Sequence, residues 1–63
     1  MDLYKYAGTH IRVKCRSGNV YEGIPSLYYD EDGTNEWVFI FPKGKSLIEV
    51  TSADIQTIEV LPD

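Results

Sequence analysis

Residues 11–23, IRVKCRSGNVYEG, carry the strongest structural signal in this chain. Apolar and basic side chains alternate up to Arg16, which is typical of a strand with one buried and one solvated face. The turn that follows contains Gly18 and an asparagine, two residue types that accept the positive φ of a tight hairpin. Tyr21 and Gly23 then lead into further strand-like segments. The stretch therefore predicts the opening hairpin of a small, bent β-barrel.

The rest of the chain continues this alternation of strand-like segments and turns. Gly23 and Pro25 interrupt a strand expected over 20–29, and such residues mark the bends that let small barrels close. The other expected elements are strands over 9–16, 37–41, 47–50 and 57–61 and one tight helical turn over 52–54.

A short helix is expected before the first strand. Asp2 would cap it, Leu3 and Tyr6 would dock it on the barrel, and Gly8 suits the left-handed position beyond its end. We therefore expect a single domain over 1–63. Its fold would be mainly β, with a short N-terminal helix and a five-stranded, strongly bent antiparallel barrel.

Size and composition narrow the function. A domain of 63 residues buries only about 60% of its unfolded surface, so its core is marginal. One cysteine and one histidine provide neither a disulfide nor a zinc site within one chain, which leaves self-association as the expected source of extra burial. The absence of a signal-like or membrane-spanning apolar run predicts a soluble, cytoplasmic protein without a membrane partner.

The sequence offers no catalytic or cofactor-binding constellation. His10 and Cys15 are expected on opposite faces of the first strand, so they would not form a catalytic pair, and we expect no enzymatic activity and no cofactor. The acidic segment 30–36 offers oxygen ligands for a cation but lacks the spacing of a calcium loop. We interpret it as a solvated hairpin tip and expect no metal.

Basic residues on the first strand are the main candidate for nucleic-acid contact. His10, Arg12, Lys14 and Arg16 would share one face, and the nearby Tyr28 and Tyr29 could stack bases. The alternative is a solvated face whose charges pair across the sheet with Glu22 or Glu59, as cross-strand ion pairs commonly do. The net charge of −4 argues against a general affinity for phosphate backbones.

Aromatic and aliphatic residues in the later strands are candidates for an oligomer interface. The segment 37–41 is apolar on both faces of a strand, so one face needs a cover, either the N-terminal helix or a neighbouring subunit. The candidate interface residues are Trp37, Phe39, Phe41, Ile48, Val50, Ile58 and Val60.

The order of these elements resembles the Sm and Sm-like family. The resemblance covers nearly the whole chain and rests on Gly18, Tyr21 and Gly23 in the first hairpin, Asp30 and Asn35 around the next loop, and the pattern Ile48, Val50, Ile55, Ile58 near the end. It implies a five-stranded barrel that forms rings or smaller oligomers by pairing its fourth strand with the fifth strand of the next subunit. It also implies RNA contacts at Asp30 and Asn35.

The chain departs from the family where RNA would be bound. Residues 51–54, TSAD, contain neither Arg-Gly nor Lys-His, and acidic residues fill the loop between Asp30 and Asn35. We therefore expect a non-enzymatic module that self-associates through edge strands and contacts a protein partner of unknown identity. The alternative is an RNA-binding oligomer that uses the basic face of the first strand.

Overall fold

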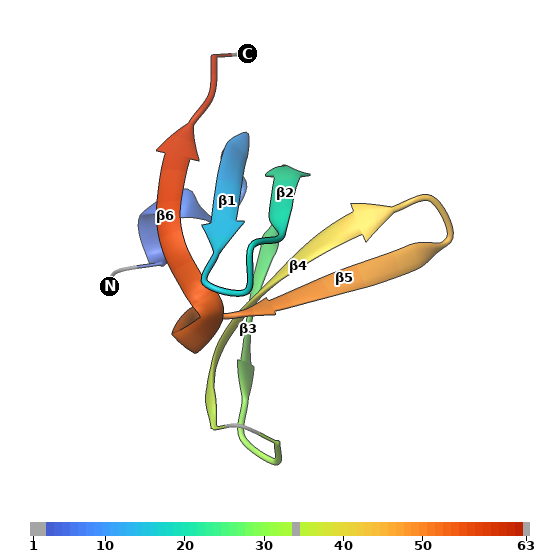
Figure 1. Cartoon of the computed structure of the whole chain (residues 1–63). Helices are drawn as coiled ribbons and strands as arrows, with labels where there is room; N and C mark the ends of the chain where they lie inside the picture. The colour runs from blue at the N-terminus through green and yellow to red at the C-terminus, as the bar shows by residue number, and fades with distance from the viewer. Residues whose placement is uncertain (1–2, 34, 63) are drawn as a thin grey trace.

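The computed structural model describes residues 3–33 and 35–62 and shows a mainly β fold (Figure 1). Its regular elements are short strands joined by tight turns. In chain order they are the 3-10 turn η1 (Tyr4–Tyr6), β1 (Ile11–Cys15), β2 (Val20–Gly23), β3 (Ser26–Asp30), β4 (Glu36–Lys43), β5 (Ser46–Thr51), the 3-10 turn η2 (Ser52–Asp54) and β6 (Ile55–Val60).

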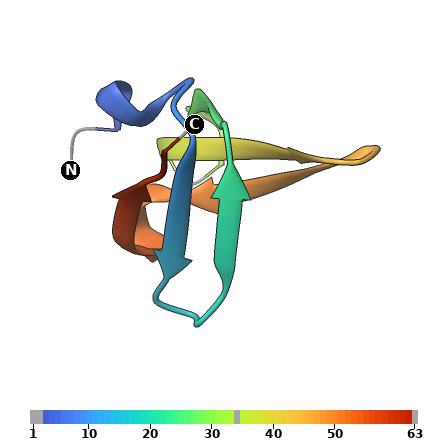
Figure 2. The same ribbon diagram turned by 90° about the horizontal axis from the view of Figure 1, so that it is seen from above.

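The strands form two antiparallel sheets of three strands each. The first sheet has the order β2-β1-β6, and the second has the order β3-β4-β5. The chain passes from the first sheet to the second at the corner between β2 and β3, and returns through η2. Figure 2 shows the hairpin of β4 and β5 extending away from the first sheet. In the described part of the chain, the strands at the sheet edges are therefore β2, β6, β3 and β5.

The expected five-stranded barrel with an N-terminal helix is wrong. The strand expected over 20–29 is two strands in different sheets, and the described residues form no closed barrel. Gly23, with φ 153°, and the buried Pro25 lie at the break, where the backbone leaves the first sheet. The six strands therefore form two separate sheets.

The N-terminal helix is reduced to the single turn η1. Leu3 is the residue before this turn and is 3% exposed, and Tyr6 packs against the core, so the predicted docking of these two side chains is confirmed. The predicted left-handed glycine is also present, because Gly8 has φ 76°. The expected cap, Asp2, lies outside the described residues.

The core lies between the inner faces of the two sheets. In β1 the burial alternates strictly, so the apolar side chains point inward and Arg12 and Lys14 point outward, as the sequence predicts. Phe39 at the centre of the second sheet is fully buried. The buried cluster consists of Leu3, Ile11, Val13, Cys15, Phe39, Phe41, Val50 and Ile55.

Asp54 ties η2 to the β1–β2 hairpin. Its backbone carbonyl accepts a hydrogen bond of 2.7 Å from the Arg16 amide, and its carboxylate accepts bonds of 3.3 Å from the amide and the hydroxyl of Ser17. Within the hairpin, Gly18 adopts φ 99°, so the predicted glycine turn is confirmed. Asp54 is therefore a structural residue of the turn region.

No helix in the described segments, 3–33 and 35–62, has the length and apolar character needed to cross a membrane.

Candidate functional site

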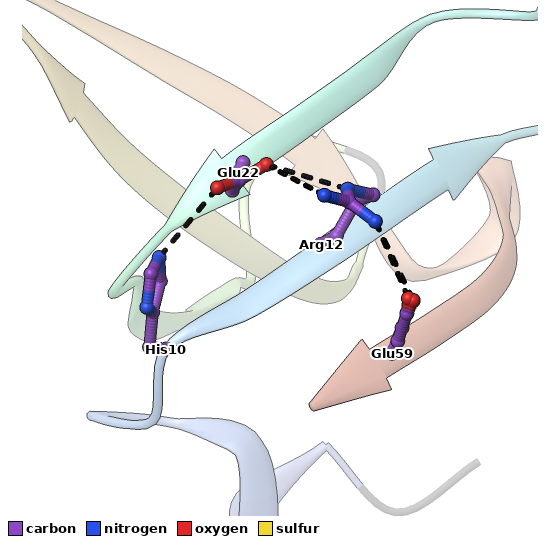
Figure 3. Close-up of polar contacts among 4 residues, drawn as sticks. All are labelled: His10, Arg12, Glu22 and Glu59. Atoms are coloured by element: carbon purple, nitrogen blue, oxygen red, sulfur yellow. Dashed lines mark hydrogen bonds and ion pairs between the residues drawn. The ribbon is translucent and has the colours of Figure 1, made fainter. Parts of the chain in front are cut away.

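Arg12 is the centre of the charged outer face of the first sheet (Figure 3). The strand register places it opposite Glu22 on one side and Glu59 on the other. Its guanidinium lies 3.3 Å from each carboxylate, and His10 Nε2 lies 3.8 Å from Glu22 Oε1. The side chains of this network are about a third to a half exposed, so water screens the ion pairs.

The predicted basic stripe is therefore interrupted. Two of its four members, His10 and Arg12, lie beside carboxylates, which is the arrangement that the alternative interpretation predicted. Lys14 lies opposite Val20 and Thr57 and has no carboxylate beside it in the described part of the chain. Arg16 follows β1 in the hairpin turn. No continuous positive face results.

The other candidate RNA contacts lie at the end of β3 and in the loop that leads to β4. The hydroxyl of Tyr29 donates to the side-chain oxygen of Asn35 at 3.0 Å, and Asn35 adopts a left-handed φ of 59°. Asp30 Oδ1 accepts a hydrogen bond of 2.7 Å from the Gly33 amide. The structure thus brings Tyr29, Asp30 and Asn35 together, but on the second sheet, whereas the basic stripe belongs to the first.

This acidic loop holds no cation site in the part of it that the structure describes. Across residues 3–33 and 35–62, no group of three or more histidine, cysteine, aspartate or glutamate side chains is arranged to hold a metal ion. The Asp30 carboxylate instead closes a local turn onto Gly33, as short acidic side chains often do.

Trp37 on β4 packs between two tyrosines. Its ring centroid lies 5.0 Å from that of Tyr4 in η1 and 4.9 Å from that of Tyr29 in β3. Such edge-to-face and tilted arrangements are favourable for aromatic pairs. Tyr4 of the N-terminal turn therefore covers Trp37, which lies on the same face of β4 as the core residues Phe39 and Phe41.

Most candidate interface residues belong to the core of the single chain. Phe39, Phe41 and Val50 are at most 2% exposed. Trp37, Ile48 and Ile58 are partly buried against that cluster. Only Val60, which is 58% exposed, presents a large apolar surface to solvent. Any interface between copies would therefore use backbone edges and a few exposed side chains rather than a continuous apolar stripe.

Cys15 is shielded and lies at the opposite end of β1 from His10. Burial is the main cause that raises the pKa of its thiol, and the charge of Asp54 and a hydrogen bond with that carboxylate raise it further. A buried thiol with a raised pKa is a poor nucleophile at neutral pH. Its position fits the small buried hydrophobic residue that the sequence predicts.

A groove opens where the β4–β5 hairpin diverges from β2. Its cavity volume is about 210 Å³, and the rings of Tyr21 and Phe41 stack along it with centroids 6.4 Å apart. The sequence does not predict this groove, because no local pattern shows that β2 lies beside a hairpin some twenty residues further along the chain. The lining residues are Val20, Tyr21, Glu22, Phe41, Pro42, Lys43 and Ile48.

No family model, curated protein or solved structure matches this chain significantly. The resemblance to the Sm-like family therefore stays a prediction, and the barrel that it implied is corrected by the two-sheet structure. The open sheet edges, the neutralised charged face and the groove are the features on which a function can be argued.

Proposed function

We propose that this protein is a non-catalytic interaction module that assembles with copies of itself by pairing the β5 edge of one copy with the β6 edge of the next. Each of these strands is hydrogen-bonded on one side only, β5 to β4 and β6 to β1. An unpaired strand edge carries a row of free backbone donors and acceptors that another strand can use.

The observation that carries the proposal is the length and composition of these two edges. Both strands have six residues, whereas β2 has four and β3 has five. Neither contains proline, lysine or arginine, the residues that commonly protect exposed edges from pairing. Both are rich in β-branched residues, which favour strand pairing.

The burial pattern supports one arrangement of the two copies in this proposal. The inner faces of both sheets are occupied by the core, so a sheet that continues across two copies keeps outer face beside outer face. Glu49 on β5 and Thr57 on β6 are exposed outer-face positions, because they lie opposite Ile40 and Lys14. A register with Glu49 of one copy beside Thr57 of the next also keeps Glu49 from lying directly opposite Glu59, where the two negative charges would repel each other.

Disulfide trapping tests this arrangement. Two single-cysteine-addition variants, Glu49→Cys and Thr57→Cys, are mixed and oxidised. Facing residues on paired strands have Cβ atoms roughly 4.5–5.5 Å apart, close enough for a bridge after small adjustments. We expect a covalent dimer that forms much faster in the mixture than in either variant alone. The native Cys15, which is 1% exposed, should stay reduced.

The matched control replaces Thr57→Cys with Asn19→Cys, an exposed position in the β1–β2 turn and away from either edge. This mixture should give only slow, collisional cross-linking. Equal rates for the two mixtures would show that Glu49 does not face Thr57, which contradicts pairing of β5 with β6 in this register.

The RNA-binding alternative has less support from the geometry. The two cations on the outer face of β1, Arg12 and Lys14, are balanced by Glu22 and Glu59, so this face provides little net charge for phosphates. Binding through this face would weaken steeply with salt and would be abolished by the double change Arg12→Glu, Lys14→Glu.

A further inference from the structure

The groove between β2 and the β4–β5 hairpin combines an open backbone edge with an apolar surface. Among the described residues, β2 pairs only with β1, so its other edge has no strand partner there. The groove residues Tyr21, Phe41 and Ile48 are apolar, and Val20 at the rim is 54% exposed. An extended peptide can hydrogen-bond to such an edge and place alternate side chains in the adjoining groove.

The size of the groove favours a peptide over a small molecule. Pockets that enclose drug-sized ligands or cofactors have volumes of roughly 300–1,000 Å³. The groove, at about 210 Å³, is smaller and suits one or two side chains. An extended strand that adds to β2 presents every second side chain to one face, so only one or two of its side chains would enter the groove.

The charges at the groove select the chemistry of the peptide. Two charged side chains are in its lining, Glu22 and Lys43. The Glu22 carboxylate already contacts Arg12 and His10, whereas Lys43 forms no ion pair within residues 3–33 and 35–62. The unmatched charge of the groove is therefore positive. A carboxylate beside an apolar side chain complements it.

We propose that the β2 edge binds an extended segment of a partner protein in which an apolar residue lies two positions from an acidic one, so that both side chains point to the same face, with the apolar side chain in the groove and the carboxylate beside Lys43. This site does not depend on self-association, because pairing through β5 and β6 leaves the β2 edge free.

Titration with a defined peptide tests the proposal. The probe is the blocked peptide Thr-Val-Thr-Asp-Thr, in which Val and Asp share one face of a strand. Its binding is followed by the backbone amide shifts in the nuclear magnetic resonance spectrum of the full chain. We expect saturable shifts in β2 and around Phe41. Lys43→Glu should weaken binding about fivefold, because an attraction is replaced by a repulsion of similar size. Lys45→Glu, two residues further along and outside the groove lining, should change it less than about twofold.

Two further comparisons make the test decisive. The peptide Thr-Val-Thr-Lys-Thr should bind the wild type more weakly and the Lys43→Glu variant more tightly than the acidic peptide does. Val20→Glu at the groove rim should reduce binding of the acidic peptide, whereas Val60→Glu, at a similarly exposed position on β6, should not. Absence of shifts in β2 at millimolar peptide, or a charge preference that ignores residue 43, would overturn the proposal. Light scattering on the same samples reports self-association separately.

Discussion

Arg12 connects all three strands of the first sheet through its side chain. It contacts Glu22 on β2 and Glu59 on β6, and Glu22 also contacts His10. Exposed ion pairs contribute little to stability because water screens them and long side chains lose freedom in forming them. The network therefore acts mainly on the surface charge, by removing a positive patch.

Replacement of Arg12 by methionine should lower the free energy of unfolding by up to about 1 kcal/mol, since it leaves two neighbouring carboxylates without a cation. The matched variant Lys14→Met, on the same strand face but without an ion pair in the structure, should change it by less than about 0.5 kcal/mol. Urea denaturation at low salt and at about 1 M salt measures both, and the difference should shrink at high salt. An equal cost for the two variants would contradict the network.

Cys15 makes the stability of the fold depend on pH in the alkaline range. Burial and Asp54 raise the pKa of its thiol in the folded state above the ordinary value of 9.0, so folding favours the protonated thiol. Its contribution to stability is fully present below that ordinary value and is lost as the pH rises through the folded-state pKa. We expect the stability difference between wild type and Cys15→Ala to be constant near neutral pH and to narrow above about pH 9. A difference independent of pH up to 11 would contradict this.

At the scale of elements, the corner between β2 and β3 decides which sheet each strand joins. Gly23 has φ 153°, in a region that L side chains rarely adopt, and an added Cβ would lie 3.5 Å from the Phe41 ring. The contact is ordinary, so the backbone conformation and not a lack of space requires glycine here.

The variant Gly23→Ala should therefore destabilise the protein by about 1–3 kcal/mol. Ile24→Ala, at the neighbouring position that is 56% exposed, should cost less than about 1 kcal/mol. Thermal or urea unfolding of both variants checks this. If Gly23→Ala were as stable as wild type, the corner would not depend on this conformation.

At the scale of the whole molecule, one small core holds two sheets together. Phe39 belongs to the central strand of the second sheet, is fully buried and packs in the cluster that includes residues of β1. Domains of this size have a small free energy of unfolding, so the loss of one large core side chain removes much of that free energy.

Phe39→Ala should cost about 3–5 kcal/mol and leave a large unfolded fraction at room temperature. Val60→Ala, at a position 58% exposed, should cost less than about 1 kcal/mol. Circular dichroism during urea unfolding distinguishes the two outcomes. A mild effect of Phe39→Ala would mean that the two sheets do not share one core.

Local patterns predicted the local structure of this chain. The alternation in β1, the glycine turn at Gly18 and the helical turn over 52–54 are all present, because hydrophobic period and turn chemistry act over a few residues. The alternative of a face paired through Glu22 and Glu59 was also predictable from the strand pattern.

The arrangement of segments far apart in the chain could be predicted less well from the sequence. Gly23 and Pro25 indicated a bend, but the sequence does not show whether a bent strand stays in one sheet or divides between two. The candidate interface residues Phe39, Phe41 and Val50 belong to the buried core. An apolar pattern in the sequence does not by itself distinguish a core from an interface. The groove depends on residues from three strands that no local signal connects.

Light scattering coupled to size exclusion, with absorbance recorded at the protein and nucleic-acid wavelengths, tests self-association through β5 and β6 most directly. We predict a mass of at least two chains of 7.2 kDa and a protein spectrum without excess nucleic-acid absorbance. The double variant Leu47→Lys, Thr57→Lys, which puts cations on both exposed edges, should give the single-chain mass, whereas Ile24→Lys at the β2–β3 corner should not change the oligomer. A single-chain mass for the wild type at all concentrations, or an oligomer unaffected by the edge lysines, would contradict the account.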